Sequence, residues 1–350
     1  MTSIFYQKKP LIGLDISKTN AHAVLMDSNK LTVHGYSSVD LDPEKDVDES
    51  DDNRDYLAKQ LTSLFSNEKV GKLNSNRVAL GIPTDRAFVR TFELPVSSES
   101  SLKETVRLEV EQYIPMPIEA LYVDHEIIER DKNNLTVVLC AVPRTLVDSI
   151  VSATEKADLE VIMIEPRINA VARLLKQAEE GKLPTIIVDI GPANTDIAIL
   201  DSAVRLTGGL NIGGNTLTLD LARKLDLSLE AAHQLKVTSG LNPGPRQSKI
   251  QSSLRPSLMR IVNEVQRIMR YYTDRFPSKA KIEQVIIVGS GSNMPGIGEF
   301  FTNELIMPAR VASPWQSLNF DNVKQPAKPL RAKFVASAGL AMINQEEIWK

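Results

Sequence analysis

The sequence predicts an α/β protein of two related lobes, with a smaller module inserted into the chain. Apolar segments short enough for strands alternate with amphipathic helical segments along the 350 residues. One strand–turn–strand pattern occurs twice, at residues 11–27 and 184–201. Residues 77–157, which lie between the two copies, have a β-β-α-β-β-α order of their own. Duplication with an insertion accounts for all three observations.

The first lobe opens with strand patterns at residues 11–16 and 21–27 and with alternating residues in 29–41, and a helix is predicted at 55–65. The module then has paired strand patterns on either side of a helix, 97–115. The serines at its start and Glu104 indicate an N-terminal cap, and Pro115 ends it. The remaining predicted elements of the module are strands 77–83, 87–95, 122–130 and 135–143 and helix 145–157.

The second lobe begins again with the hairpin of residues 184–201. A strand within 204–225 leads into a helix, and 256–276 is the longest amphipathic helix. Residues 281–305 predict a strand, a glycine-rich turn and a helix. The loops are expected at 241–247 and 308–331, and a final helix at 334–345. The predicted boundaries are 1–76 with 158–184 and 333–350 for the first lobe, 77–157 for the inserted module, 185–208 with 281–332 for the second lobe core, and 209–280 for its lid subdomain.

Composition excludes several classes of protein. Hydrophobic residues make up 42% and charged residues 24%, and the formal charge of -3 gives no overall attraction to nucleic acid. The single cysteine, Cys140, excludes an intramolecular disulfide framework and a thiolate metal cluster. The longest apolar stretches fall short of the roughly 20 residues that cross a bilayer, and residues 1–10 lack the pattern of a signal peptide. We therefore expect a cytoplasmic protein that is not inserted in a membrane.

The two hairpins align when Asp15 is set against Asp189, as IGLDISKTNAHAVLMD and IIVDIGPANTDIAILD. In both copies an aspartate stands at a strand end beside a tight turn. Backbone N–H groups of such turns can face phosphate oxygens, and small residues let the phosphate approach. The two carboxylates can hold a hydrated Mg²⁺ that bridges phosphates. The pair predicts a clamp for a nucleotide.

GLDISKT also has the spacing of a P-loop, in which four residues separate a glycine from Lys18 and Thr19. The glycine that a P-loop needs just before the lysine is absent, and a strand follows where a P-loop requires a helix. The hairpin interpretation is therefore favoured. The weak point of the hairpin interpretation is Ser17, because its Cβ would crowd a phosphate or restrict the turn. The positive charge of Lys18 could offset this effect by attracting a phosphate.

These motifs, in this order, resemble the actin-like ATPase superfamily, and within it the PilM family of type IV pilus assembly. The segment EVEQYIP at residues 109–115 resembles a segment of that family. The resemblance implies an actin-like ATPase fold with two duplicated ribonuclease H-like lobes and an inserted subdomain of the FtsA and PilM type. It also implies ATP and Mg²⁺ as cofactors.

The resemblance assigns roles to individual residues. Glu165, followed by a proline, would polarise the attacking water in a slow hydrolysis, and Asp15 and Asp189 would hold the metal. The implied nucleotide contacts are Asp15, Lys18, Thr19, Asn20, Asp189, Gly191, Thr195, Asp196, Gly213, Gly214, Glu264, Arg267, Gly289, Gly291 and Ser292. The pair Glu264 and Arg267 is also consistent with an ordinary ion pair on a helix surface.

The function implied is a cytoplasmic ATP-binding scaffold of type IV pilus assembly, peripheral to the inner membrane through its partners. Those partners would be the N-terminal peptide of a PilN-like membrane protein and the pilus motor ATPases. Alternatives stay open: a pseudo-ATPase scaffold without tight nucleotide binding, an FtsA-like filament protein of cell division, and a small-molecule kinase of the same superfamily. The ending QEEIWK, without an amphipathic helix, disfavours the FtsA-like alternative.

Overall fold

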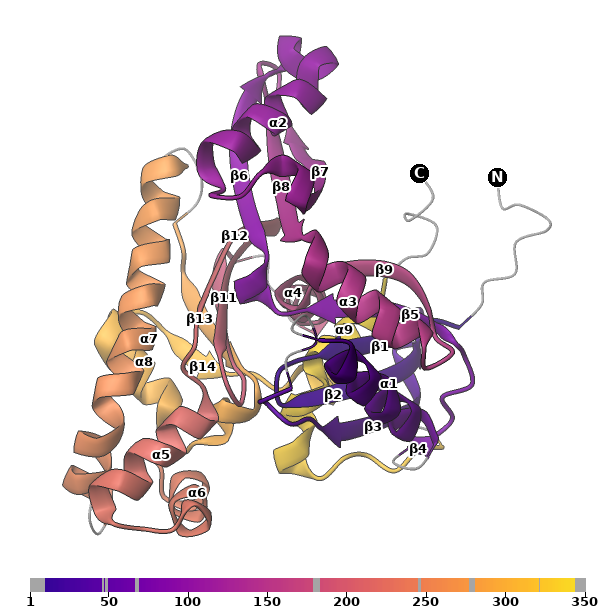
Figure 1. Ribbon diagram of the computed structural model, residues 1–350. Helices are drawn as coiled ribbons and strands as arrows, with labels where there is room; N and C mark the ends of the chain where they lie inside the picture. Colours follow the sequence, from indigo (N-terminus) through magenta and orange to yellow (C-terminus); the bar gives the residue numbers. More distant parts are fainter. Residues whose placement is uncertain are drawn as a thin grey trace. The chain divides into compact units, whose positions relative to one another are not determined.

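The computed structural model describes residues 10–45, 47, 50–66, 69–178, 183–244, 247–276, 281–320 and 322–343; Figure 1 labels its helices and strands. The chain divides into two compact units. Unit 1 comprises Met1–Pro83, Thr145–Ala178 and Pro314–Lys350, and unit 2 comprises Thr84–Arg144 and Glu179–Ser313.

Unit 1 is built on a six-stranded sheet with the order β4-β3-β2-β1-β5-β9. The first three strands form an antiparallel meander, and β5 and β9 run parallel to β1. The strands are β1 (Ile12–Ile16), β2 (Asn20–Asp27), β3 (Thr32–Asp40), β4 (Val70–Gly71), β5 (Arg77–Ile82) and β9 (Glu160–Pro166).

The helices of unit 1 are α1 (Asp51–Ser66), α3 (Arg144–Glu155), α4 (Arg167–Ala178) and α9 (Val335–Ala341), and the short 3-10 helices η5 (Pro314–Ser317) and η6 (Lys328–Phe334) precede α9. Two glycines allow α9 to lie very close to its neighbours. A Cβ on Gly13 of β1 would be 1.9 Å from the Ser337 carbonyl oxygen, and one on Gly339 would be 1.9 Å from the Ala170 carbonyl oxygen. The helix is therefore held between β1 and α4, and every residue of it is buried.

Unit 2 contains a five-stranded sheet with the order β12-β11-β10-β13-β14. It repeats the plan of unit 1, since β10, β11 and β12 form an antiparallel meander and β13 is parallel to β10. The strands are β10 (Thr185–Ile190), β11 (Thr195–Asp201), β12 (Ala203–Leu210), β13 (Gln284–Val288) and β14 (Ala309–Val311). The helices are α5 (Gly214–Leu225), α6 (Leu229–Thr238), α7 (Gln247–Arg275) and α8 (Ile297–Leu305), with η4 (Ser290–Asn293) before α8.

Most of the apolar core of unit 2 lies between this sheet and α7. Ile186, Val188 and Ile190 of β10 share one cluster with Leu258 and Ile268 of the helix. Because side chains alternate along a strand, Asp189 points from the other face of the sheet. The core therefore determines which face presents the acidic residue.

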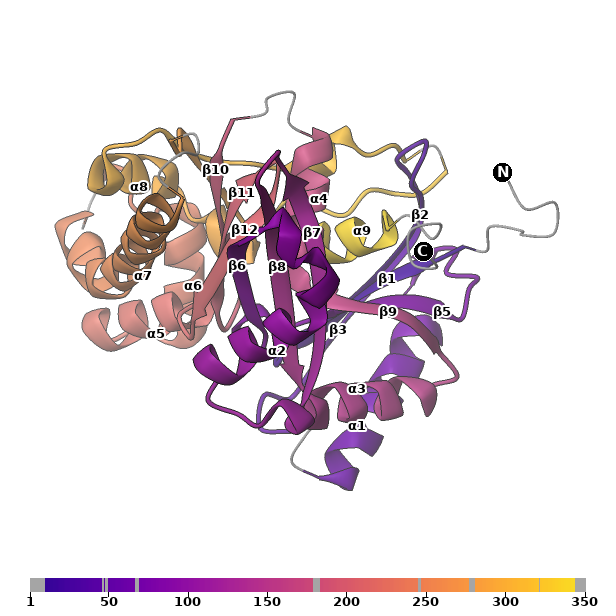
Figure 2. The same cartoon turned by 90° about the horizontal axis from the view of Figure 1, so that it is seen from above.

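A three-stranded antiparallel sheet with the order β6-β8-β7 completes unit 2. The helix α2 covers one of its faces in both Figure 1 and Figure 2, and Val106 and Val110 of that helix share a core with Phe92 and Val137. The elements are β6 (Phe88–Pro95), β7 (Leu121–Arg130), β8 (Asn134–Pro143) and α2 (Leu102–Tyr113), with the 3-10 turns η1 (Thr84–Arg86), η2 (Val96–Ser101) and η3 (Ile118–Ala120). This sheet lies inside the predicted module of residues 77–157, whose first strand and last helix belong to unit 1. The predicted division into lobe, module and lid stays a prediction.

The structure differs from the sequence prediction in several local features. The helix α7 begins at Gln247, within the predicted loop, and continues through Pro256. The predicted cap of helix 97–115 is absent: a 3-10 turn of residues 96–101 leads into α2, and Ser101 makes no side-chain capping bond. Apolar burial along α7 outweighs the cost of an internal proline, which sequence pattern alone treats as a helix start.

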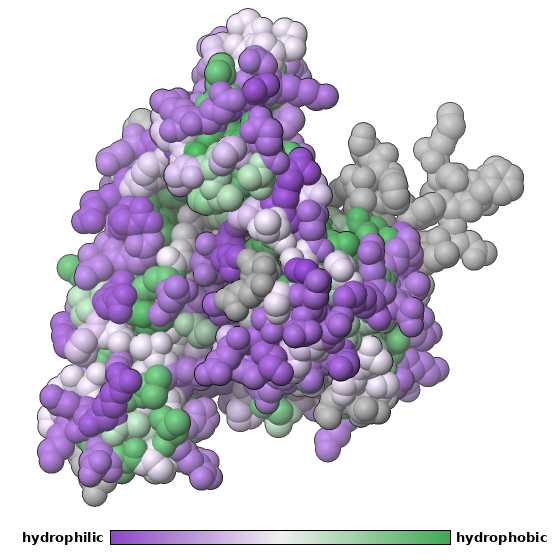
Figure 3. Space-filling model, viewed as in Figure 1, coloured by the Kyte–Doolittle hydropathy of each residue, from purple (hydrophilic) through white to green (hydrophobic). Residues whose placement is uncertain are grey.

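No helix in the described part of the chain is long and apolar enough to cross a membrane. On the face shown in Figure 3, hydrophobic residues are interspersed among hydrophilic ones.

Candidate functional site

The Asp189 hairpin places two buried carboxylates side by side. Asp189 near the end of β10 is paired directly with Asp196 of β11, and the two are 2% and 0% exposed. Gly191 N–H donates to the Asn194 carbonyl oxygen at 2.9 Å, which closes the turn. The Asn194 amide donates to Asp196 Oδ1 at 3.1 Å. Directly opposed side chains in an antiparallel pair share a face of the sheet, so both carboxylates project from the face opposite α7.

The start of α5 is attached to this turn. Gly214 N–H donates to the Gly191 carbonyl oxygen at 2.9 Å, and Thr195 Oγ1 donates to the Ile212 carbonyl oxygen at 2.6 Å. A Cβ on Gly213 would lie 2.6 Å from the carbonyl oxygen of Gly191, so a larger residue would push the helix away. The positive end of the α5 macrodipole is thereby held beside Asp189 and Gly191.

The glycine-rich turn after β13 also lies beside the Asp189 turn. Gly289 has φ +86°, and a Cβ there would be 2.2 Å from Asp189 Oδ1. A Cβ on Gly291 would be 2.3 Å from Ile190, and one on Gly214 would be 3.6 Å from Gly291 Cα. Three glycine segments that are far apart in the sequence therefore converge on Asp189. The Ser292 hydroxyl donates to the Gly289 carbonyl oxygen at 2.7 Å and stabilises the turn.

Lys236 of α6 is a buried cation at this place that the sequence analysis missed. Its Nζ donates to the Gly214 carbonyl oxygen at 2.6 Å and to Thr218 Oγ1 at 2.8 Å. Burial lowers its pKa to about 8. Ala232 and Lys236 are the buried residues of α6, and this i,i+4 spacing on one helix face is the signal that could have revealed it.

Glu264 and Arg267 lie elsewhere, on α7. The guanidinium donates from Nε to Glu264 Oε2 at 2.8 Å, and this hydrogen bond raises the Arg267 pKa. A Cβ on Gly208 would lie 3.3 Å from Glu264 Oε1, whereas one on Gly209 would lie 3.4 Å from Asp196 Oδ1. Successive residues of β12 face opposite sides, so the ion pair and the two aspartates lie on opposite faces of the sheet.

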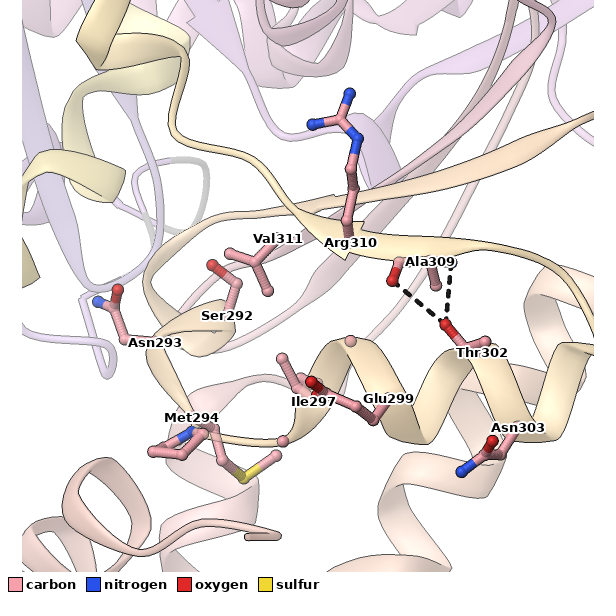
Figure 4. A pocket seen from close by; sticks show the side chains of 13 residues that line it. Ser292, Asn293, Met294, Ile297, Glu299, Thr302, Asn303, Ala309, Arg310 and Val311 are labelled. Atoms are coloured by element: carbon pink, nitrogen blue, oxygen red, sulfur yellow. Dashed lines mark hydrogen bonds between the residues drawn. The ribbon is translucent and has the colours of Figure 1, made fainter.

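A pocket of about 620 Å³ lies between η4, α8 and β14. Figure 4 shows its lining, where Thr302 of α8 exchanges hydrogen bonds with the backbone of Ala309 in β14. Of the predicted site residues, it contains Ser292. Apart from Glu264 and Arg267, the predicted residues of unit 2 therefore lie around the Asp189 turn, and of them Ser292 also lines this pocket.

The first copy of the hairpin, in unit 1, keeps the same backbone bond: Ser17 N–H donates to the Asn20 carbonyl oxygen at 2.9 Å. Here the Ser17 hydroxyl oxygen also accepts from Thr19 N–H at 3.4 Å and from Asn20 N–H at 3.2 Å. The Asn20 side chain donates to Thr19 Oγ1 at 3.0 Å, and Lys18 is exposed. Two amide donors that the clamp hypothesis gives to phosphate are used inside the turn.

Asp15, 2% exposed, has basic and aromatic neighbours. Arg167 Nε lies 3.3 Å from Asp15 Oδ1, and His22 Nδ1 lies 4.0 Å from Oδ2. Burial, with Lys333 and Arg167 as nearby positive charges, lowers the His22 pKa to about 3, so the imidazole is neutral at pH 7. The His22 ring packs edge-on against Phe334.

Glu165, the predicted catalytic residue, is 6% exposed at the end of β9. Arg173 of α4 donates to both of its carboxylate oxygens, at 2.7 and 2.8 Å, and also to the Gly339 carbonyl oxygen at 3.0 Å. A bidentate guanidinium fixes the carboxylate in plane and occupies both oxygens. The local role of Glu165 is to join β9, α4 and α9.

The comparisons with known proteins agree with this architecture. A sequence model of the family described as type IV pilus assembly protein PilM matches residues 13–345. The chain belongs to the PilM family. A PilM–PilN type IV pilus biogenesis complex contains a chain with a TM-score of 0.78 and 22% identity, over 95% of this chain and 97% of that one. The fold is that of the actin-like ATPases, since MreB5 of Spiroplasma citri bound to AMPPNP matches with a TM-score of 0.54 and 13% identity, over 95% of both chains.

Among curated proteins, cell division protein FtsA of Neisseria meningitidis serogroup B is 28% identical over 205 residues, which cover 52% of this chain and 49% of FtsA. The chain thus spans about half the length of the curated relatives it matches. The prediction of an actin-like fold and of membership in the PilM family is confirmed.

Proposed function

We propose that this PilM-family chain is an ATP-binding scaffold of type IV pilus assembly. The observation that carries the proposal is the convergence of three glycine segments on Asp189, where Gly289 has a positive φ that side chains disfavour. The glycines let these backbone segments pack closely against one another, as backbone turns that bind phosphate do. Nucleotide-bound MreB5 shares the fold, and its ligand supports the choice of ATP.

In unit 2, the α5 dipole would favour the negative charge of a phosphate group, while the N–H groups of Gly214 and Asn215 already donate to the carbonyl oxygens of Gly191 and Pro192. Asp189 and Asp196 form a pair of oxygen donors that suits Mg²⁺. The described residues contain no cluster of three or more metal-binding side chains, so the remaining ligands would be water and phosphate, as Mg²⁺ usually keeps. When bound, the ion would neutralise phosphate charge.

Binding, and not turnover, is the role that the residues support. Glu165 would have to leave its bidentate pair with Arg173 before it could orient a water. We therefore propose that ATP acts as a ligand whose bound state stabilises one conformation of the chain. Slow hydrolysis through Glu165 remains the second candidate, and a Glu165→Gln variant with an unchanged rate of phosphate release would exclude it.

The proposed partner is the N-terminal peptide of a PilN-like membrane protein, and the support is the PilM–PilN complex of a structural neighbour. The proposed docking region is beside the β6-β8-β7 sheet. Tyr122 of β7 is 42% exposed there, and the Arg144 guanidinium lies 4.2 Å from the centre of its ring. An exposed aromatic ring beside a cation suits a short peptide that carries apolar and acidic groups. Such a partner would keep the chain at the inner membrane, close to the pilus motor ATPases.

Calorimetry with ATP and Mg²⁺ tests the nucleotide proposal. We expect the wild type to bind and Asp189→Ala to lose at least about tenfold in affinity, or 1.4 kcal/mol. The control is Asp274→Ala, an exposed aspartate of α7, which should bind as the wild type does. If the wild type does not bind ATP, the pseudo-ATPase scaffold is the correct alternative.

The partner proposal has a separate test. A synthetic PilN N-terminal peptide should be retained by the immobilised chain, and Tyr122→Ala should weaken retention. Equal retention by Tyr122→Ala and the wild type would place the peptide elsewhere. Absence of retention by the wild type, together with nucleotide-dependent sedimentation, would favour an FtsA-like filament protein.

A further inference from the structure

The two hairpin copies place different groups beside their aspartates. Across the antiparallel pair, Asp189 faces Asp196, whereas Asp15 faces His22. The second copy therefore pairs two carboxylates, and the first pairs a carboxylate with an imidazole. The same backbone plan carries a different electrostatic environment in each unit.

The parallel strands of unit 1 bring a guanidinium to Asp15. The register pairs Asp15 with Gly81, and Gly81 with Glu165, so Arg167 at the start of α4 lies one strand beyond Gly81. A Cβ on Gly81 would be 3.4 Å from Asp15 Oδ1 and 3.5 Å from Arg167 Cβ, so Gly81 lies between the two side chains. Arg167 Nε lies 3.3 Å from Asp15 Oδ1, within ion-pair distance, and both side chains are largely buried, 11% and 2% exposed.

A divalent cation at Asp15 does not fit these neighbours. Mg²⁺ takes oxygen ligands at about 2.0–2.1 Å, which would put its charge within a few ångströms of the Arg167 guanidinium. Coulomb repulsion at that separation is strong where water is excluded. Among the described residues, Arg167 and His22 lie within ion-pair distance of Asp15, and Lys333 adds a positive charge near His22. None of these offers an oxygen ligand.

We infer that Arg167 takes the place of the divalent cation at Asp15, so that Asp15 is an ion-pair partner and any metal that accompanies the nucleotide is held from the Asp189 copy. The inference deepens the proposed nucleotide function. It corrects the sequence-based assignment of Asp15 as a metal ligand, because an arginine is the cation beside it.

The first test needs no nucleotide. We would measure thermal unfolding of the wild type, Asp15→Asn, Arg167→Gln and the double variant, each with and without millimolar Mg²⁺. Both single variants should lower the melting temperature. The double variant should lose less than the sum of the two single losses, because two neutral amides replace a buried charged pair. Any stabilisation by Mg²⁺ should be equal in the wild type and in Asp15→Asn, because the proposed Mg²⁺ ligands are Asp189 and Asp196. Additive losses, or stabilisation of the wild type by Mg²⁺ that Asp15→Asn removes, would overturn the inference.

The exposed pair of Lys156 and Asp55 in the same unit is the control for coupling. Its cycle, with Asp55→Asn and Lys156→Gln, should show almost no coupling because exposed ion pairs contribute little.

The second test measures the Mg²⁺ concentration that half-saturates binding at fixed ATP. Asp15→Asn/Arg167→Gln should change this concentration by less than about threefold, and Asp189→Asn should raise it by about tenfold or more. A tenfold rise in the double variant would show that Asp15 is a ligand. Failure of the wild type to bind ATP would contradict the proposed function alone, and the unfolding cycle would still decide the inference.

Discussion

Ser17 and Gly191 occupy the same position in two copies of one hairpin, and their N–H groups make the same backbone bond at 2.9 Å. The sequence suggested that the Ser17 Cβ would crowd a phosphate. In the structure the hydroxyl oxygen accepts from the Thr19 and Asn20 amides. It occupies donors that a phosphate would otherwise use.

Two variants separate these explanations. Ser17→Ala removes the hydroxyl and keeps Cβ, and Ser17→Gly removes both. If the hydroxyl is decisive, both variants should bind ATP severalfold more tightly, with a gain of about 1 kcal/mol or less, and Ser17→Ala should equal Ser17→Gly in calorimetry. A gain in ATP affinity in Ser17→Gly alone would show that the Cβ of Ser17, and not its hydroxyl, weakens binding.

Lys236 gives the protein a pH dependence of known sign. Its pKa is lowered by burial from 10.5 to about 8. Between those values the unfolded chain holds more protons than the folded one, so the free energy of unfolding rises with pH across this window on account of this residue. Below pH 8 the cost of the buried charge is fully present.

The measurement is urea unfolding at pH 8 and pH 9.5. The wild type should gain about 1.5 kcal/mol relative to Lys236→Met over this interval, because the variant lacks the titrating group. His233, whose pKa is lowered by burial and by the charge of Lys236, is neutral throughout the interval and does not disturb the comparison. Parallel pH profiles of the two proteins would contradict the burial of a titrating Lys236.

At the scale of elements, α9 depends on close approach to its neighbours. Gly339→Ala would place a Cβ 1.9 Å from the Ala170 carbonyl oxygen of α4. We expect it to destabilise the chain by about 3 kcal/mol or more, because neither helix backbone can move without opening the core. Chemical denaturation measures the loss.

Gly298→Ala in α8 is the matched control, a helical glycine whose Cβ would meet its nearest atom at 3.3 Å. It should be close to neutral, since alanine also favours the helix. Equal losses in the two variants would mean that the α4–α9 contact is not as close as described.

Helices and strands were predictable where the hydrophobic periodicity agreed with the turn-forming residues at their ends. The hairpins of residues 11–27 and 184–201 correspond to β1–β2 and β10–β11, because continuous apolar runs with a short turn allow little else. The start of α7 was not predictable, because Pro256 signals a helix start and the nine residues before it are mostly polar. In the site, the glycines and Asp189 were found from the motif. Lys236 was not found from the sequence. Arg167 and Arg173 were not recognised as counter-charges of Asp15 and Glu165, because these pairings are set by the strand register across β1, β5 and β9.

For the molecule as a whole, Arg205 joins the three-stranded sheet to the rest of unit 2. It is 3% exposed, its Nη2 donates to Glu129 Oε2 of β7 at 2.7 Å, and its Nε donates to the Asp201 carbonyl oxygen at 3.1 Å. The Thr91 hydroxyl of β6 donates to its carbonyl oxygen, and Tyr272 of α7 donates to Asp201 Oδ2 at 3.0 Å. Arg205 thus links β6 and β7 directly, and it reaches α7 through Asp201.

Arg205→Met should lower the free energy of unfolding by about 2 kcal/mol, because it removes the hydrogen bonds of a buried guanidinium to Glu129, which is 38% exposed, and to the Asp201 carbonyl oxygen. Hydrogen exchange should speed up in β6 and β7. Arg130→Met on β7, next to Glu129, is the control. Arg130 is half exposed and pairs with Glu99 at the surface, so its loss should have little effect on stability. Unchanged exchange in β6 and β7 of Arg205→Met would show that the three-stranded sheet is held by other contacts.

The division into two units has a covalent consequence. Unit 1 is made of three stretches of chain and unit 2 of two, so the polypeptide passes from one to the other at residues 83–84, 144–145, 178–179 and 313–314. A single proteolytic cut at any of these points leaves the two units joined by the three remaining chain connections. Neither unit can be expressed as one uninterrupted segment, and limited proteolysis should yield nicked full-length protein under native conditions before any fragment dissociates.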